Sequence, residues 1–271
     1  MTTTAGRPLQ GRRILVTRPR AQAAQLTRLL ATYGAETVTL PTIRIDPPED
    51  WTPLDEAIRS LDGFRCLIFT SVNGVAAFRE RLRHAGRSAL RMSHQIVVAI
   101  GPATAEALRR EGLPADVVPE EFTAEGVVAA LRLRIAHGDT VLLVRAAEAR
   151  DVLPRELAAA GARVTIAPAY RTAPTREGAE RALALLEARQ IDAVTFTSSS
   201  TVRGFVALVA PDNAARILSD VVVAAIGPIT AATAAEHGLR VSVMPHEYTV
   251  PALAEAIAGH FATSSPAALR S

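Results

Sequence analysis

The segment AIGPAT at residues 99–104 returns, with one substitution, as AIGPIT at residues 225–230, which is 126 positions later (225 − 99 = 126). Further pairs follow in the same order at an offset of 126 or 127. They are FTS at 69–71 and 196–198, Arg18 and Arg145, Gly34 and Gly161, Pro41 and Pro168, Arg44 and Arg171, and PEEFT at 119–123 with PHEYT at 245–249. So many ordered matches at one long period predict a duplicated domain, because solenoid repeats are much shorter.

Within each copy, short apolar runs alternate with longer helical stretches. The runs at 14–16, 66–69 and 96–100 are apolar at every position, which is typical of parallel strands buried on both faces. Alternating strands and helices predict a parallel sheet that is covered by helices on both sides. The fold class expected from the sequence is therefore α/β, with two similar flavodoxin-like domains that each contain an open parallel sheet.

Helix boundaries are marked by residues that commonly begin or end helices. A helix over 21–33 is expected to end at Gly34, and Thr52 is expected to cap a helix whose first turn contains a proline. Thr123 and Thr249 are expected to cap the last helix of each copy. The offsets alone fit two connectivities equally well: contiguous halves, or halves that exchange their first segments.

The composition excludes several classes of protein. The 271 residues include no lysine, so a Schiff-base lysine, a pyridoxal phosphate site and a Walker A lysine are all excluded. The formal net charge is +3 with dispersed arginines, which fits a small polyanionic ligand and gives no signature of nucleic-acid binding. The single cysteine, Cys66, lies in a predicted strand, and the histidines show no metal-binding spacing. We expect no metal, no signal peptide and no membrane span, and therefore a cytoplasmic protein.

Ligands of open parallel sheets bind outside the carboxyl ends of the strands, where loops lead into helices. In GPAT and GPIT, glycine permits a tight turn, proline fits the first helical position, and the free N–H groups attract carboxylates. These segments, like the serines that follow FT, could instead be ordinary helix starts; their occurrence in both copies favours a shared ligand cleft. The candidate substrate-binding residues are Arg18, Ser71, Asn73, Gly101, Thr104, Ser198, Ser199, Ser200, Gly227 and Thr230.

Tyr170 is one of only three tyrosines, and its counterpart in the other copy is Ile43 (170 − 43 = 127). The two copies therefore differ in polarity within a segment predicted to connect the domains. Tyr170 is either a half-buried linker residue or a phenolic proton donor that faces the substrate. The sequence contains neither G-x-S-x-G nor G-x-G-x-x-G, which argues against a serine nucleophile and a dinucleotide.

Several segments together resemble the uroporphyrinogen-III synthase family. They are VTRP at 16–19, FTSVNGV at 69–75, AIGPATAEAL at 99–108, PAYRT at 168–172 and AIGPITAATAAEHG at 225–238, and the likeness extends from about Arg13 to Ala258. The resemblance implies two domains joined by two neighbouring linkers, near residues 41–46 and 168–173. Residues 1–42 and 172–265 would form the first, discontinuous domain, and residues 43–171 the second. The chain departs from the family after Arg145, where AAEAR replaces a glycine-rich turn, so Arg145 is a doubtful ligand.

The same resemblance implies a lyase of porphyrin and heme biosynthesis that cyclises the linear tetrapyrrole hydroxymethylbilane. It would remove water and invert ring D to give uroporphyrinogen III, with Tyr170 as the acid and without a cofactor. A monomer with transient contact to the upstream hydroxymethylbilane synthase is expected. The main alternative is a non-catalytic two-domain sensor or regulator that binds an anionic small molecule, and a glycosyl or phosphoryl transferase ranks third.

Overall fold

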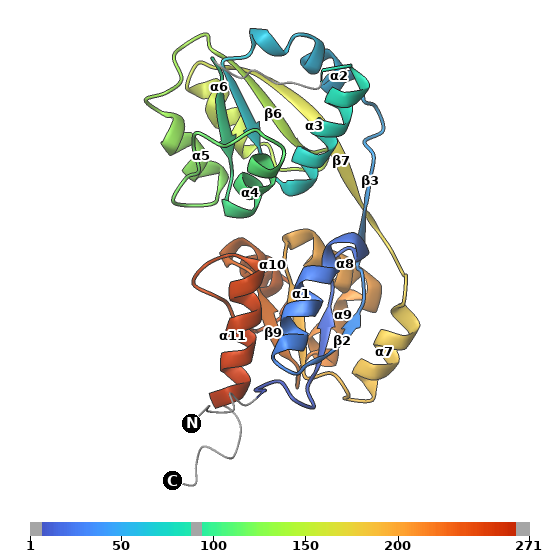
Figure 1. Ribbon diagram of the computed structural model, residues 1–271. Coiled ribbons are helices and arrows are strands. Elements are labelled where there is room, and N and C mark those ends of the chain that lie inside the picture. The colour runs from blue at the N-terminus through green and yellow to red at the C-terminus, as the bar shows by residue number, and fades with distance from the viewer. Residues whose placement is uncertain (1–6, 88–93, 264–271) are drawn as a thin grey trace. The chain divides into compact units, whose positions relative to one another are not determined.

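The computed structural model describes residues 7–87 and 94–263 (Figure 1). These residues divide into two compact units. Unit 1 comprises the described residues up to Arg44 together with those from Ala173 onward, and unit 2 comprises Ile45–Thr172. Unit 1 is therefore built from both ends of the chain, and unit 2 is inserted between them.

Unit 1 contains one five-stranded sheet with the strand order β10-β9-β8-β1-β2. Its neighbouring strands pair in parallel. Numbered along the chain within this unit, the order is 2-1-3-4-5, as in flavodoxin. The elements are β1 (Arg13–Val16), α1 (Arg20–Thr32), β2 (Glu36–Thr39), α7 (Ala179–Glu187), β8 (Ala193–Phe196), α8 (Ser199–Val209), α9 (Pro211–Ile217), β9 (Val222–Ala225), α10 (Pro228–Glu236), β10 (Val241–Val243) and α11 (Val250–Thr263).

Unit 2 repeats this arrangement with the strand order β3-β7-β6-β4-β5, in which β5-β4-β6-β7 correspond to β9-β8-β1-β2. Apart from β3, through which the chain enters, the first strand of unit 2 is β4, the counterpart of β8, so the two units are permuted versions of one fold. The elements are β3 (Ile43–Asp46), α2 (Thr52–Arg59), a 3₁₀ turn (Leu61–Gly63), β4 (Cys66–Phe69), α3 (Val72–His84), β5 (Ile96–Ala99), α4 (Pro102–Arg110), α5 (Ala124–Leu131), β6 (Thr140–Ala146), α6 (Val152–Ala159) and β7 (Arg163–Pro174).

Each sheet has a hydrophobic cluster on both faces, which explains the apolar runs in the sequence. In β4, Leu67 and Phe69 pack with α2, α3 and α4, whereas Cys66 and Ile68 pack with α5 and α6 on the opposite face. Unit 1 likewise has α7–α10 on one face and α1 and α11 on the other. The duplication extends to side-chain geometry: Phe69 meets Phe78 edge to face at 5.1 Å between ring centroids, and the counterparts Phe196 and Phe205 do so at 5.6 Å. The predicted α/β fold with parallel sheets is confirmed.

The chain passes between the units through β3 and β7, which are neighbours in one sheet. The sequence indicated that Pro168 marks a linker, but it lies inside β7, paired with Arg145 of β6. β7 continues from the unit 2 sheet to Pro174 and carries Tyr170 along it, and its register against β6 shifts between Pro168 and Tyr170.

The predicted terminating and capping residues are confirmed with one exception, and α1 spans Arg20–Thr32 where a helix over 21–33 was expected. Gly34 follows α1 with φ of +96°, and Thr123 and Thr249 accept hydrogen bonds from the N–H groups of Gly126 and Ala252. The prediction for Thr52 is wrong: Thr52 is the first helical residue, and Asp50 accepts its N–H at 2.8 Å. Among the described residues, the longest apolar helices are too short or too polar to cross a membrane.

Candidate functional site

The carboxyl edge of the unit 2 sheet brings together three strands that carry candidate residues. β4 lies between β5 and β6, and β7 lies beside β6. Phe69, the last residue of β4, pairs with Val144, and Ala146, the last residue of β6, pairs with Tyr170. Ser71 follows β4 directly, so the extension of β7 brings Tyr170 to the edge at which α3 begins.

Tyr170 forms side-chain hydrogen bonds with Ser71 and Asn73. Its ring is half-buried against the cluster formed by α2, α3 and α4. Burial raises the pKa of the phenol above its ordinary value of 10.0; the two hydrogen bonds lower it, and the negative charge of Glu148 raises it. Because burial dominates, Tyr170 is protonated at neutral pH and can donate a proton or a hydrogen bond.

The two partners of Tyr170 lie in the first turn of α3. Ser71 is the N-cap residue, and its Oγ accepts the N–H of Gly74 at 3.1 Å. Asn73 is the second helical residue. The start of a helix carries partial positive charge, which stabilises negative charge on a nearby oxygen. These groups oppose the effect of burial, which still raises the pKa of the Tyr170 phenol above its ordinary value.

The two Gly-Pro turns have the same construction in both units. Gly101 and Gly227 are the N-cap residues of α4 and α10. A Cβ on Gly101 would lie 3.4 Å from Cγ of Phe122, and one on Gly227 would lie 3.1 Å from Cγ of Tyr248. An aromatic ring thus covers each glycine, which links the repeated GP segment to the repeated PEEFT and PHEYT segments. The sequence motifs indicated both segments but not their contact.

Thr104 and Thr230 were predicted to bind substrate through their hydroxyls. Both lie in the first turn of their helices, and they are only 4% and 5% exposed. A ligand would reach these hydroxyls only if the turn opened. The role of these hydroxyls as substrate ligands stays a prediction. The backbone N–H groups of the same turns are still candidate ligands, because they lie at the start of each helix.

In unit 1, the residues 198–200 form a compact hydroxyl cluster at the start of α8. Ser198 caps α8 in a reciprocal capping box with Thr201. Its Oγ lies 2.9 Å from Oγ of Ser200, and Oγ of Ser199 lies 2.7 Å from Oγ1 of Thr233 on α10. The structure therefore brings the three predicted serines together, at the carboxyl end of β8 and against α10.

Arg18 follows β1, the strand next to β8. Its Nη2 donates to Oε1 of Gln22 at 3.3 Å. Within the described part of the chain, its buried Nε has no hydrogen-bond partner. Burial lowers the pKa of the guanidinium, yet an arginine stays charged at neutral pH. Arg18 thus provides a half-buried cation with unused hydrogen-bonding capacity at the edge of unit 1.

Comparison with known proteins identifies the family. The family model described as uroporphyrinogen-III synthase HemD matches residues 24–255. This chain belongs to the uroporphyrinogen-III synthase family. The uroporphyrinogen-III synthase of Synechococcus elongatus is 37% identical over 258 residues, covering 93% of this chain and 97% of the relative. That of Chlorobaculum parvum is 32% identical over 248 residues, covering 90% and 97%.

Solved structures agree with the fold. A mutant uroporphyrinogen III synthase from the extremely thermophilic bacterium Thermus thermophilus has a TM-score of 0.68 at 20% identity, covering 94% of this chain and 100% of that one. The enzyme from Helicobacter pylori has a TM-score of 0.56 at 19% identity, covering 92% and 99%. The predicted family and the prediction of an enzyme are confirmed, and a non-catalytic sensor is not favoured. At these identities the structures support the fold alone.

In this member of the uroporphyrinogen-III synthase family, Arg145 is the unit 2 counterpart of Arg18. Its guanidinium has different hydrogen-bond partners from that of Arg18. Its Nη2 donates to Oδ1 of Asp151 at 2.8 Å and its Nη1 to the carbonyl of Arg150 at 3.0 Å. The residue is only 6% exposed. The turn after Arg145 thus supplies its Nη atoms with partners from within the protein, although its Nε, like that of Arg18, has no partner among the described residues. Arg18 differs in having a neutral partner.

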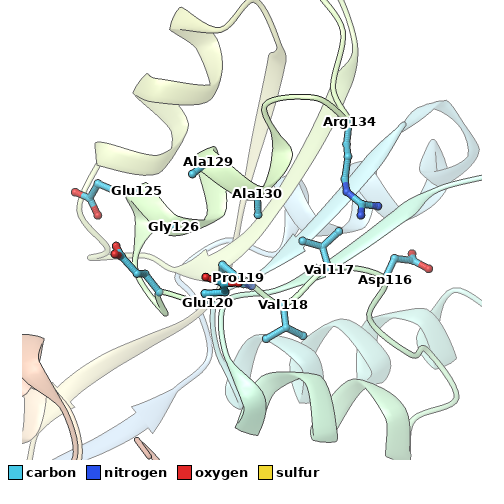
Figure 2. A pocket seen from close by; sticks show the side chains of 11 residues that line it. Asp116, Val117, Val118, Pro119, Glu120, Glu125, Gly126, Ala129, Ala130 and Arg134 are labelled. Atoms are coloured by element: carbon cyan, nitrogen blue, oxygen red, sulfur yellow. The ribbon is translucent and has the colours of Figure 1, made fainter. Parts of the chain in front are cut away.

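A separate pocket of about 620 Å³ lies between α5 and the segment that follows α4 (Figure 2). Its lining is Asp116, Val117, Val118, Pro119, Glu120, Glu121, Glu125, Gly126, Ala129, Ala130 and Arg134. Four of these side chains are acidic, and none of the predicted site residues is among them. An acidic lining disfavours a polycarboxylate, so this pocket is a poor candidate for the substrate site. Across residues 7–87 and 94–263, no cluster of histidine, cysteine and acidic residues could hold a metal ion.

Proposed function

We propose that this enzyme cyclises hydroxymethylbilane to uroporphyrinogen III, with loss of water and inversion of ring D. The observation that carries the proposal is the protonated phenol of Tyr170, half-buried at the carboxyl edge of unit 2 beside the start of α3. Membership of the family supplies the reaction class, and the phenol supplies the acid that the reaction requires. The product serves tetrapyrrole and heme biosynthesis.

The chemistry requires a proton donor because hydroxide is a poor leaving group. In the proposed mechanism Tyr170 donates its proton to the departing hydroxyl, which leaves as water, and the resulting cation is attacked by the substituted position of ring D. The spiro intermediate rearranges and the macrocycle closes, and the proton lost from the pyrrole restores the phenol. The reaction transfers no electrons and the substrate carries its own leaving group, so the proposal needs no metal and no organic cofactor.

The substrate carries many carboxylates, and each unit offers groups that bind them. Backbone N–H groups at the starts of α3, α4, α8 and α10 carry partial positive charge. Ser198, Ser199 and Ser200 add hydroxyls in unit 1, and Arg18 adds a guanidinium with an unpaired Nε among the described residues. We assign Arg18 to a substrate carboxylate, because charge-assisted bonds to guanidinium are strong and directional.

Replacing Arg18 by glutamine tests this assignment. We expect KM for hydroxymethylbilane to rise about tenfold, because one charge-assisted hydrogen bond is lost, while kcat changes little. Arg28→Gln on the exposed part of α1 removes the same charge elsewhere and is expected to leave KM unchanged. Steady-state kinetics at two salt concentrations measures both variants. Equal KM values for the two variants would contradict a specific role for Arg18.

The reaction itself is tested by determining which isomer of the product forms. Hydroxymethylbilane closes spontaneously to the type I isomer, whereas the enzyme is expected to give the type III isomer. Purified protein is supplied with hydroxymethylbilane from the upstream synthase, the products are oxidised, and the two isomers are separated by chromatography. An isomer composition equal to that of the control without enzyme would overturn the proposed function.

Three further properties belong to the same proposal. A substrate that closes spontaneously favours rapid transfer, which supports transient contact with the upstream hydroxymethylbilane synthase. We further propose that the active form is a monomer. A substrate made by other enzymes of the cytoplasm supports the same location for this one.

A further inference from the structure

Ser199 and Thr233 form a pair of hydroxyls that joins α8 to α10 in unit 1. Oγ of Ser199, in the first turn of α8, lies 2.7 Å from Oγ1 of Thr233. Thr233 is only 6% exposed, and its hydroxyl lies 3.0 Å from the carbonyl oxygen of Ile229, four residues earlier in α10. Ser199 is partly exposed, and its Oγ lies 3.4 Å from the same carbonyl oxygen. The pair thus has a buried end at Thr233 and an accessible end at Ser199.

The duplicated fold shows that its architecture does not require this pair. The counterparts in unit 2 are Val72 (199 − 127 = 72) and Ala107 (233 − 126 = 107), and neither has a hydroxyl. Val72 lies in the first turn of α3, as Ser199 does in α8, and is 45% exposed. The helices α3 and α4 nevertheless pack together in unit 2. The hydroxyl pair is therefore a feature of unit 1 that needs another explanation.

The distances determine the direction of the two hydroxyl protons, because each hydroxyl has only one to donate. If Thr233 donates to the carbonyl of Ile229, which is a common bond of threonine within helices, Ser199 must supply the proton of the 2.7 Å contact. If Thr233 donates to Ser199 instead, Ser199 donates to the carbonyl at 3.4 Å. Turning the Ser199 proton outward would leave one of these oxygen–oxygen contacts without a proton, which is unfavourable. Ser199 therefore offers a ligand its lone pairs and not its proton.

The neighbouring serines have the opposite character. Oγ of Ser198 accepts the N–H of Thr201 at 3.2 Å and lies 2.9 Å from Oγ of Ser200. Only one proton fits between the two serine oxygens, so these contacts leave the other hydroxyl proton available. The start of α8 thus presents a hydrogen-bond donor, from Ser198 and Ser200, beside an acceptor, which is Ser199.

We propose that Ser199 accepts a hydrogen bond from a pyrrole N–H of the substrate, and that Thr233 is the positioning residue that directs the Ser199 proton inward. This inference rests on the proposed function, because it takes the substrate to be a linear tetrapyrrole. The carboxylates of such a molecule only accept hydrogen bonds, whereas the N–H of each pyrrole ring only donates. Backbone N–H groups and Arg18 offer no acceptor for that N–H. Ser199 therefore recognises the pyrrole rings, while the donors around it bind carboxylates.

Replacing Ser199 by alanine removes the acceptor. We expect KM for hydroxymethylbilane to rise about fivefold at nearly unchanged kcat, which corresponds to the loss of one neutral hydrogen bond. The increase is expected to be the same at two salt concentrations, because no charged group is removed. Ser219→Ala makes the same change at an exposed residue before β9, at the opposite edge of the sheet, and is expected to leave KM unchanged.

Replacing Thr233 by valine distinguishes an acceptor from a donor at Ser199. Valine keeps the shape of the buried side chain and removes the hydroxyl that bonds to Ser199. If Ser199 accepts from the substrate, the loss of its partner is expected to raise KM about twofold, and Thr233→Ser is expected to restore most of the affinity. If Ser199 donated to a carboxylate instead, the proton freed by Thr233→Val would strengthen that bond and KM would fall.

Two results would overturn the inference. An unchanged KM in Ser199→Ala would show that the pair only joins α8 to α10, and an unchanged or lowered KM in Thr233→Val would contradict the acceptor role. Circular dichroism checks the folding of each variant. Ser199→Ala, at a partly exposed position, still decides whether Ser199 contacts the substrate if Thr233→Val does not fold. The isomer formed by the parent tests the proposed function without either substitution, so failure of the inference is distinguishable from failure of that function.

Discussion

Tyr170→Phe is expected to lower kcat about 100-fold, within the range that a single general acid contributes. The substitution removes one oxygen and keeps the ring, so the packing against α2, α3 and α4 is retained. Ser71 and Asn73 lose a shared partner, which costs about 1 kcal/mol of unfolding free energy and leaves the protein folded. KM is expected to change little, because the phenol acts in proton transfer to the leaving hydroxyl and not in binding the substrate.

The measurement follows both the rate and the product. Single-turnover kinetics with hydroxymethylbilane gives the chemical step, and isomer separation gives the fraction of type III product. As the enzymatic step slows, spontaneous closure competes, so the type I fraction is expected to rise. Tyr33→Phe makes the same chemical change at the end of α1 in unit 1, and it is expected to leave the rate unchanged. A rate for Tyr170→Phe equal to that of the parent would remove Tyr170 as the acid.

The pH dependence of kcat follows from the same residue. Burial raises the pKa of the phenol above its ordinary value of 10.0, so the acid form persists throughout the neutral and mildly alkaline range. Activity that depends on this proton is present below the pKa and is lost as the pH rises through it. We therefore expect no decline of kcat attributable to Tyr170 below about pH 9 in the folded enzyme. Profiles of kcat for the parent and for Tyr170→Phe check this expectation.

Much of the fold could be predicted because the same local sequence features occur in both copies of the duplicated domain. The apolar runs of β4 and β5, the serine caps of α3 and α8, and the Gly-Pro starts of α4 and α10 all follow from short-range chemistry. The connectivity could not be predicted from the offsets, since contiguous and exchanged halves have the same period. The error at Thr52 has a local cause: Asp50 accepts the N–H of Thr52, and the helix begins at Thr52 with Trp51 as its N-cap residue.

The site was harder to predict because its decisive contacts join distant segments. Tyr170 was identifiable as the polar exception to Ile43, but its approach to Ser71 and Asn73 depends on β7 extending through residues 168–173, where a linker was expected. Burial of Thr104 and Thr230 depends on how the first turns of α4 and α10 pack, and a sequence motif does not report the exposure of one hydroxyl. The unpaired Nε of Arg18 in the described chain is likewise a property of packing.

Gly126→Ala is expected to destabilise the protein by about 3 kcal/mol, the upper part of the usual range for overpacking. A Cβ at this position would lie 2.0 Å from the carbonyl oxygen of Glu121 and 2.9 Å from its carbonyl carbon. These are backbone atoms, so a rotamer change cannot relieve the clash. The shift required would disturb the start of α5, where Thr123 accepts the N–H of Gly126 at 3.0 Å and Val127 packs beneath the sheet.

Gly259→Ala is the matched control, since it makes the same change inside α11, where nothing lies within 4 Å of the added Cβ. Alanine is the better helix former by about 0.5–1 kcal/mol, so this variant is expected to be slightly more stable. Urea unfolding is followed by the fluorescence of the single tryptophan, Trp51, which lies in unit 2 with Gly126, and by circular dichroism. An unchanged midpoint for Gly126→Ala would mean that the turn from Glu121 to α5 can widen without cost. The two identical substitutions are therefore expected to change the stability of the protein in opposite directions. Backbone crowding outweighs helix propensity at Gly126, whereas at Gly259 there is no crowding.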